Sequence, residues 1–235
     1  MYRSEDARAQ TPQGKGRFPG FDVLGQVGTW DEVTAGVVLA RLALPGALSF
    51  FTPDEVAAAG PLLDHLLLQD NEPRIPVLAL IDQRLSIGET DGWHYDDMPE
   101  DGAAWRESLR FLDNDARKRN RAGFAELEPT QQAALIQAVQ DRATHGKPWH
   151  GWDAGHVWSL WTRYACTAFY SHPWAWNEIG FGGPAYPRGY LNPGIDAREH
   201  WEVADHRDVD PVPFAQRVEE ARHQHEDLVA EEAQP

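Results

Sequence analysis

Residues 157–170 read VWSLWTRYACTAFY, a very apolar and aromatic stretch in which Arg163 is the one charged residue. A segment that is hydrophobic nearly all round is typical of a helix buried inside a domain. We therefore expect a buried helix here. Cys166 lies in the middle of it with no adjoining cation, so we expect a buried and inert thiol.

Further apolar runs with helical spacing precede this stretch. Thr52-Pro53-Asp54-Glu55 combines a capping residue, a first-turn proline and a glutamate three residues on, which predicts a helix from there to about Gln69. Other helices are expected over 33–44, 75–85 and 100–120, and from Glu128-Pro129-Thr130 onward. No alternating strand pattern occurs. The predicted fold class is mainly α, a compact domain of about five to seven helices.

The 235 residues divide by composition into three parts. We predict an N-terminal arm over 1–28, a helical domain over 29–195, and an acidic tail over 196–235. The tail carries twelve acids against four bases. A terminal helix is expected within it, with one apolar seam formed by Phe214, Val218, Ala221, His225 and Leu228.

The formal net charge of −16 argues against a protein that binds nucleic acid or an anionic membrane through charge. No apolar stretch is long enough to span a bilayer, so direct membrane insertion is not expected. The first residues contain acids where a signal peptide needs bases and then apolar residues, and no twin-arginine pair opens the chain. We expect a cytoplasmic protein, with export as part of a complex left open.

Residues that would carry chemistry are scarce. No glycine-rich nucleotide-binding turn, phosphate-binding loop or nucleophile elbow occurs, so we predict no catalytic residue. One alternative is an independent metal-dependent enzyme that uses His145, His150, His156 and Asp153. The histidine spacings of five and six do not suit one helix face, so we predict no metal site.

The most unusual segment is the irregular stretch over 173–194, which is rich in Trp, Tyr, Gly and Pro. Aromatic rings offer large contact areas at a low entropic cost, and prolines stiffen a loop before it binds. We predict partner contacts at Trp174, Trp176, Phe181, Tyr186 and Tyr190, in a loop shaped by Gly180, Gly182, Gly183 and Pro184. Sugar stacking by an aromatic carbohydrate-binding module is a second alternative, although polar residues that could read hydroxyl groups are few.

Several motifs, in this order and spacing, resemble the gluconate 2-dehydrogenase subunit 3 family. They are Phe50-Phe51-Thr52-Pro53-Asp54-Glu55, Ile81-Asp82-Gln83-Arg84-Leu85, Phe124-Ala125-Glu126-Leu127 with Gln131-Gln132, Phe169-Tyr170-Ser171-His172-Pro173, and Trp176-Asn177-Glu178-Ile179-Gly180-Phe181-Gly182-Gly183-Pro184. The likeness covers about residues 50–192. The chain departs from the family at 172–177, where the family tends to have Asp-Pro followed by a Gly-Gly-Asn turn.

The resemblance implies a small, helical, non-catalytic subunit. In that family the small subunit pairs with a large flavoprotein of the glucose–methanol–choline type, which holds FAD and oxidises a sugar or polyol. A cytochrome subunit often completes the membrane complex. The small subunit is thought to help the large one fold, mature or be exported. We therefore expect no cofactor in this chain and FAD in its partner.

Overall fold

The computed structural model describes residue 18 and residues 21–43, 46–69, 72–194, 197–199 and 201–202. Along these residues the chain forms, in order, the 3₁₀ helix η1 (Val23–Thr29), α2 (Glu32–Ala40), α3 (Pro53–Leu67), α4 (Val77–Ser86), α5 (Asp101–Asn120), the 3₁₀ helix η2 (Phe124–Glu126), α6 (Pro129–Thr144), β1 (Pro148–Trp149), β2 (Trp152–Asp153), α7 (Ala154–Ser171) and α8 (Pro173–Ile179).

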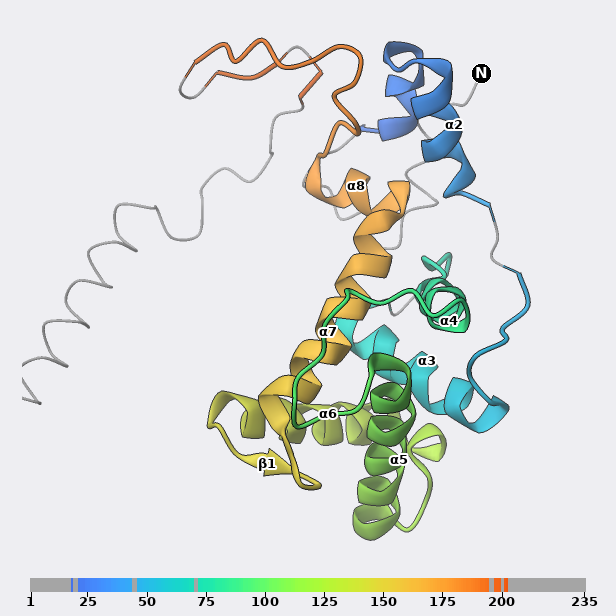
Figure 1. The fold of residues 1–235 in the computed structure, drawn as a ribbon, viewed down its shortest axis with the longest axis vertical. Coiled ribbons are helices and arrows are strands. Elements are labelled where there is room, and N and C mark those ends of the chain that lie inside the picture. The colour runs from blue at the N-terminus through green and yellow to red at the C-terminus, as the bar shows by residue number, and fades with distance from the viewer. Residues whose placement is uncertain are drawn as a thin grey trace, which may run out of the picture.

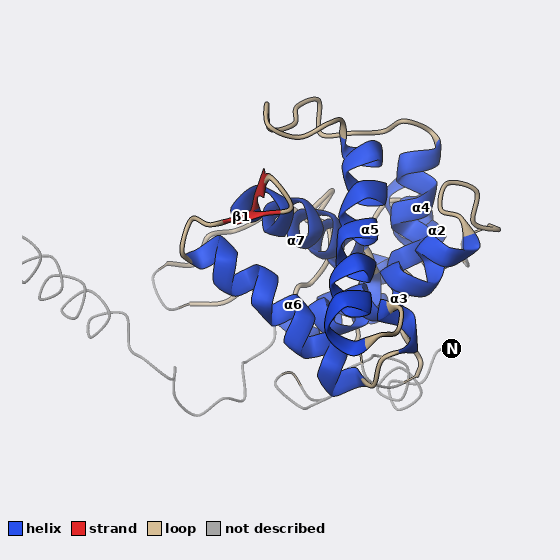
Figure 2. Ribbon diagram, turned by 90° about the horizontal axis from the view of Figure 1, so that it is seen from below, coloured by secondary structure: helices blue, strands red, loops and turns tan. Residues whose placement is uncertain are grey.

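Helices make up nearly all of the regular structure (Figure 2), and the prediction of a mainly α fold is confirmed. The described residues also contain one small antiparallel ladder, in which Trp149 of β1 pairs with Trp152 of β2. Strands of two residues are too short to show an alternating pattern, so periodicity could not reveal them. No helix in the described part of the chain is both long and apolar enough to cross a membrane.

Helix α7 packs against α3, α4, α5 and α6 and runs through the main core (Figure 1). Its buried side chains, among them Val157, Trp161 and Tyr164, recur every three or four residues and so share one face. The indole nitrogen of Trp161 donates a 2.9 Å hydrogen bond to the Ser108 hydroxyl of α5, which satisfies the polar atom of a fully buried ring. The predicted buried helix over 157–170 is confirmed.

The prediction for Cys166 was wrong, because this side chain is exposed. The core-facing positions 157, 161, 164, 165 and 168 define one face of α7, and position 166 points away from it. The face that carries Cys166 also carries Ser159, Thr162, Arg163 and Thr167, so the spacing of these polar residues, rather than the apolar composition of the stretch, indicates the side that the core leaves open.

The motif around residue 52 is fastened to the motif around residue 82. Thr52 caps α3 in a reciprocal capping box with Glu55, as predicted. The buried carboxylate of Asp82 accepts hydrogen bonds from the backbone N–H groups of Ser49, Phe50 and Phe51 at 2.7, 3.0 and 2.8 Å. These three bonds hold the approach to α3 against α4.

The motifs around residues 124 and 131 also meet. The Gln132 side chain, on α6, donates to the Phe124 carbonyl at 3.0 Å, and its amide oxygen lies 3.2 Å from His65 Nε2 on α3. Gln132 is buried, as is Phe124. Replacing this buried amide is costly, because the Phe124 carbonyl and the His65 ring would each lose a hydrogen bond.

A second, smaller core lies at one end of the molecule, where Figure 1 shows η1, α2 and α8 together. We call residues 21–43 and 173–194 the head. Its core consists of Phe21, Val23, Trp30, Val38 and Trp176. Two of these, Phe21 and Val23, come from the predicted N-terminal arm and are buried against the rest of the head.

Helix α8 corrects the expectation of an irregular stretch from residue 173. The ring nitrogen Nδ1 of His172 accepts a hydrogen bond from Trp174 N, Pro173 takes the first helical position, and Gly180 ends the helix in a left-handed conformation. Each is a normal helix signal. Seven residues are too few to show an apolar period, so the helix was missed. The stretch after Gly180 carries no further helix or strand up to residue 194.

The predicted terminal helix of the acidic tail lies outside the described residues. The boundaries predicted at residues 28 and 195 stay predictions.

Candidate functional site

The predicted contact residues divide into exposed and buried ones. The side chains of Phe181, Tyr186 and Tyr190 are 40%, 66% and 60% exposed. Trp174 is partly buried against the main core, and Trp176 is only 5% exposed. The exposed rings therefore come from the stretch after α8, while the two tryptophans of α8 pack within the chain.

Trp176 supports one of the exposed rings, that of Phe181. Its indole nitrogen donates to the Tyr170 carbonyl at 2.7 Å, and the Arg41 guanidinium lies 5.7 Å from its ring centre. The ring of Phe181 meets it edge to face at 5.4 Å. Such aromatic pairs stabilise beyond their buried area, so Phe181 is held in place by a ring that is itself fixed.

Of the three glycines predicted to shape the loop, two occupy positions where the structure requires glycine. Gly180 and Gly183 have φ values of +66° and +76°, and an added Cβ would collide with the ring of Phe18 at Gly180 and with the ring of Trp30 at Gly183. At Gly182 an added Cβ would lie 3.1 Å from Trp201 Cδ1. Pro184 follows this close approach and is partly buried. The loop is thus wedged between rings from both ends of the described chain.

Arg188 fastens the same loop. Its guanidinium donates to the Thr29 hydroxyl at 3.0 Å and to the Gly182 carbonyl at 2.9 Å, and it stacks 4.4 Å from the Trp201 ring centre. A loop held in this way loses little entropy when it binds. Sequence reasoning missed Arg188, because its partners are 159 and 6 residues away.

Asn177 is a second missed residue. Its side-chain oxygen accepts a 2.8 Å hydrogen bond from the Val23 backbone N–H, which joins α8 to η1. Its amide nitrogen lies 3.5 Å from the Asp22 carboxylate, which caps η1. The Asn177 side chain is buried, so the head depends on this polar link.

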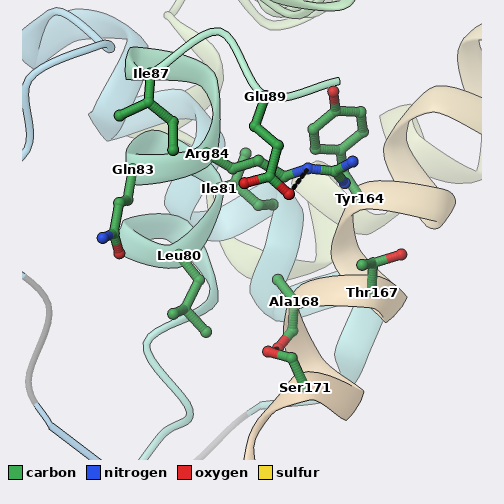
Figure 3. A pocket seen from close by; sticks show the side chains of 10 residues that line it. All are labelled: Leu80, Ile81, Gln83, Arg84, Ile87, Glu89, Tyr164, Thr167, Ala168 and Ser171. Carbon is green, nitrogen blue, oxygen red and sulfur yellow. Dashed lines mark hydrogen bonds and ion pairs between the residues drawn. The ribbon is translucent and has the colours of Figure 1, made fainter. Parts of the chain in front are cut away.

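A groove of about 390 Å³ lies between α4 and α7 (Figure 3). Leu80 and Arg84 line it from α4, and Thr167 and Ser171 from α7. Arg84 is paired with Asp91 at 2.5 Å and with Glu89 at 3.7 Å, and the Glu89 pair is drawn in Figure 3. The single cation of the groove is therefore already neutralised, so the groove does not attract an anion.

Tyr164, which lines this groove, belongs to a polar network between α7 and α5. The Tyr164 hydroxyl donates a 2.6 Å hydrogen bond to Asp101 Oδ2, and Arg163 lies 3.4 Å from the same carboxylate. Burial, with the hydrogen bond to Asp101, raises the pKa of Tyr164 well above its usual value. The hydroxyl stays protonated at neutral pH, and it holds α7 against the start of α5 rather than acting as a base.

A second groove, of about 450 Å³, lies beside α3 and α4. Its lining is mostly apolar and includes Leu48, Leu63 and Ile75. Arg74 at its edge forms an ion pair with Asp64. The charged residues that line this groove, Asp64 and Arg74, are paired with each other, so the lining offers no unpaired charge that would select a ligand.

The histidines considered as metal ligands are not brought together. His150 pairs with Asp115 at 2.9 Å, and His156 pairs with Asp97 at 2.7 Å. Asp153 caps α7 through Gly155 N. His145 Nδ1 lies 2.6 Å from the Asp141 carbonyl oxygen in the last turn of α6. Within the described residues, no group of three or more His, Cys, Asp or Glu side chains is placed to hold a metal ion.

Comparison with known proteins gives one match. The family model described as gluconate 2-dehydrogenase subunit 3 matches residues 53–183, which is more than half of the chain. Searches of curated proteins and of solved structures gave no match. The matched region runs from the first turn of α3 to Gly183, the glycine that packs on Trp30.

Proposed function

The chain belongs to the gluconate 2-dehydrogenase subunit 3 family, and from this premise we propose that it is a non-catalytic small subunit. It binds and stabilises a large flavoprotein of the glucose–methanol–choline type that oxidises a sugar or polyol. The observation that carries this proposal is the pre-formed loop of exposed aromatic rings. Phe181, Tyr186 and Tyr190 are exposed on a backbone fixed by Trp30 and Arg188.

The physical route is burial of apolar surface. Aromatic rings on a loop whose backbone is held in place are suited to bury area against a partner at a low entropic cost. A subunit that binds the folded large chain, and not the unfolded one, stabilises it by mass action. It also covers surface through which the large chain could aggregate. Stabilisation and maturation of the partner then follow from one binding event.

FAD is assigned to the partner, because in the described residues no strand leads through a glycine-rich turn into an uncapped helix N-terminus that could hold its pyrophosphate. In the described residues, the strand that leads directly into a helix is β2, which precedes α7. The Asp153 carboxylate accepts a 2.7 Å hydrogen bond from Gly155 N there. A carboxylate in that place occupies the N–H group and repels a phosphate. A cytochrome subunit and a cytoplasmic site of assembly complete the proposal.

The test is co-expression of the affinity-tagged chain with an FAD-binding large chain of the glucose–methanol–choline type from the same organism. We expect a purified complex with flavin absorbance, and more soluble large chain than without the small subunit. The triple variant Phe181→Ala, Tyr186→Ala, Tyr190→Ala should lose the flavoprotein. Ile87→Ala, which changes an aliphatic side chain that is 70% exposed and lines the groove between α4 and α7, outside the loop, should keep it. A tagged chain that stays monomeric and free of flavin, with no effect on the yield of the large chain, rejects the proposal.

A further inference from the structure

We infer that the outward face of α2 is a second docking surface for the same large subunit, and that it binds an uncharged apolar patch there. This inference rests on the proposed function and extends it to an element outside the matched region 53–183. Helix α2 has no charged residue from Val33 to Ala40. Val33 and Val37 are 75% and 54% exposed, while Val38 is the residue that the head buries.

A helix that is apolar on all sides is normally buried on all sides. Among the described residues, α2 is held on one side, by Val38 in the head core and by Arg41, which donates to the Ser171 carbonyl at 3.0 Å. Val33, Gly36, Val37 and Ala40 recur at the spacing of one helix face, and all four are exposed. A Cβ added at Gly36 would meet nothing within 4 Å, so this face is open to close approach.

The N-terminal end of α2 lies beside the base of the loop of exposed rings. Helix α2 begins two residues after Trp30, the ring on which Gly183 packs, and Arg188 ties the loop to Thr29. Figure 1 shows α2 and the loop at the same end of the molecule. One partner surface can therefore reach both.

The exposed apolar side chains of α2 and of the loop together approach the area of a standard interface. Averaged over the aromatic rings and the smaller valine and leucine residues counted here, the surface is on the order of 150–200 Å² per residue. At the exposed fractions found here, the combined area is on the order of 600 Å², close to the ~800 Å² per partner of a standard interface. The residues counted are Val33, Val37, Phe181, Tyr186, Tyr190 and Leu191.

The net charge of the chain favours a different protein, rather than a second copy of this chain, as the partner that covers the α2 face. The chain carries a net charge of −16, so two copies repel each other, while this face contributes no charge of its own. Charged residues are depleted at the centre of interfaces, as they are here. The occupant we assign is an apolar patch on the large subunit.

The experiment measures binding of the double variant Val33→Glu, Val37→Glu to the purified flavoprotein. Both side chains are exposed and glutamate is the better helix former, so the fold should be kept, which circular dichroism and thermal unfolding check. The matched control is Ile87→Glu, the same kind of change at an equally exposed aliphatic residue. We expect the dissociation constant to rise at least about tenfold for the double variant and less than about twofold for the control.

Three results overturn the inference. In the first, the wild-type chain and the double variant bind equally tightly, and the proposed function survives. In the second, the wild-type chain self-associates in sedimentation and the double variant is monomeric, which assigns α2 to a second copy. In the third, the wild-type chain does not bind the flavoprotein, and the proposed function fails with the inference.

Discussion

Gly183 lies directly against the indole ring of Trp30, so close that a Cβ at residue 183 would overlap ring carbon Cζ2. The two residues are 153 positions apart in the sequence, and their contact closes the head around its small core. The backbone of Gly183 is also left-handed, with φ of +76°. Space and conformation therefore both require glycine.

Gly183→Ala should destabilise the head. The alanine adds a left-handed strain of about 1–2 kcal/mol and an overlap with Trp30 that costs about 1–3 kcal/mol more. Gly189→Ala is the matched control, because its φ is +69° and its Cβ would meet nothing within 4 Å. Urea unfolding should show a clearly larger loss for Gly183→Ala. Equal losses would mean that the Trp30 contact is not tight in solution.

Asp82→Asn should lower the free energy of unfolding by about 2–3 kcal/mol. The substitution replaces one carboxylate oxygen, which accepts from backbone N–H groups of residues 49–51, with an NH₂ group that faces a donor. Asp141→Asn makes the same chemical change at an exposed residue whose carboxylate accepts one hydrogen bond, from the Gln137 side chain, and should cost less than about 0.5 kcal/mol. Similar midpoints of chemical unfolding for both variants would contradict the assigned role.

Tyr164→Phe should cost about 1–3 kcal/mol, because it removes the buried hydrogen bond to Asp101 and leaves that carboxylate with the weaker 3.4 Å contact from Arg163. Tyr170→Phe tests the same change on the same helix, at a ring that is 46% exposed, and should be close to neutral. Thermal unfolding of the two variants side by side distinguishes them. A neutral Tyr164→Phe would show that the network does not hold α7 to α5.

His172 should make stability depend on pH between about 6.5 and 4. Burial lowers the pKa of His172 in the folded chain to about 4, whereas in the unfolded chain it is about 6.5. Between these values the unfolded chain binds more protons, so the free energy of unfolding falls as the pH falls from 6.5 toward 4. Above about 6.5 this residue contributes no pH dependence.

The variant His172→Asn isolates that effect, because asparagine can still cap α8 and does not titrate. We expect urea midpoints for the wild-type chain and the variant to differ by a constant amount from pH 7 to 8. Below pH 6.5 the wild-type midpoint should drop faster than that of the variant. Parallel curves over the whole range would show that His172 is solvated in the folded chain.

Cys166 should react with a thiol reagent in the folded protein, because its side chain is exposed on α7. Labelling with Ellman's reagent should go to completion without denaturant. Cys166→Ser should change the free energy of unfolding by less than about 0.5 kcal/mol. If labelling required urea, Cys166 would be buried in solution, as the sequence predicted, and its exposure in the structure would be wrong.

Much of the fold could be predicted from local patterns. The start of α3 at Thr52-Pro53, the buried run of α7 and the helix after Pro129 all follow from capping residues and apolar period, because both act within a few residues. The family could be predicted from motifs, and the structure gives some of them a physical purpose. Asp82 and Gln132 bind backbone groups of the neighbouring motifs.

The sequence by itself determined that this is a helical chain with an aromatic, glycine-rich stretch and few residues suited to catalysis. Only the tertiary structure decided which rings are exposed. Trp176 and Tyr186 are both aromatic residues of the same stretch. Trp176 is buried in the core that contains Val23 and Trp30, whereas Tyr186 faces solvent. Burial depends on contacts between residues far apart in the chain, such as Asn177 with Val23, Gly183 with Trp30 and Arg188 with Thr29. Such contacts leave no periodic signal in either partner.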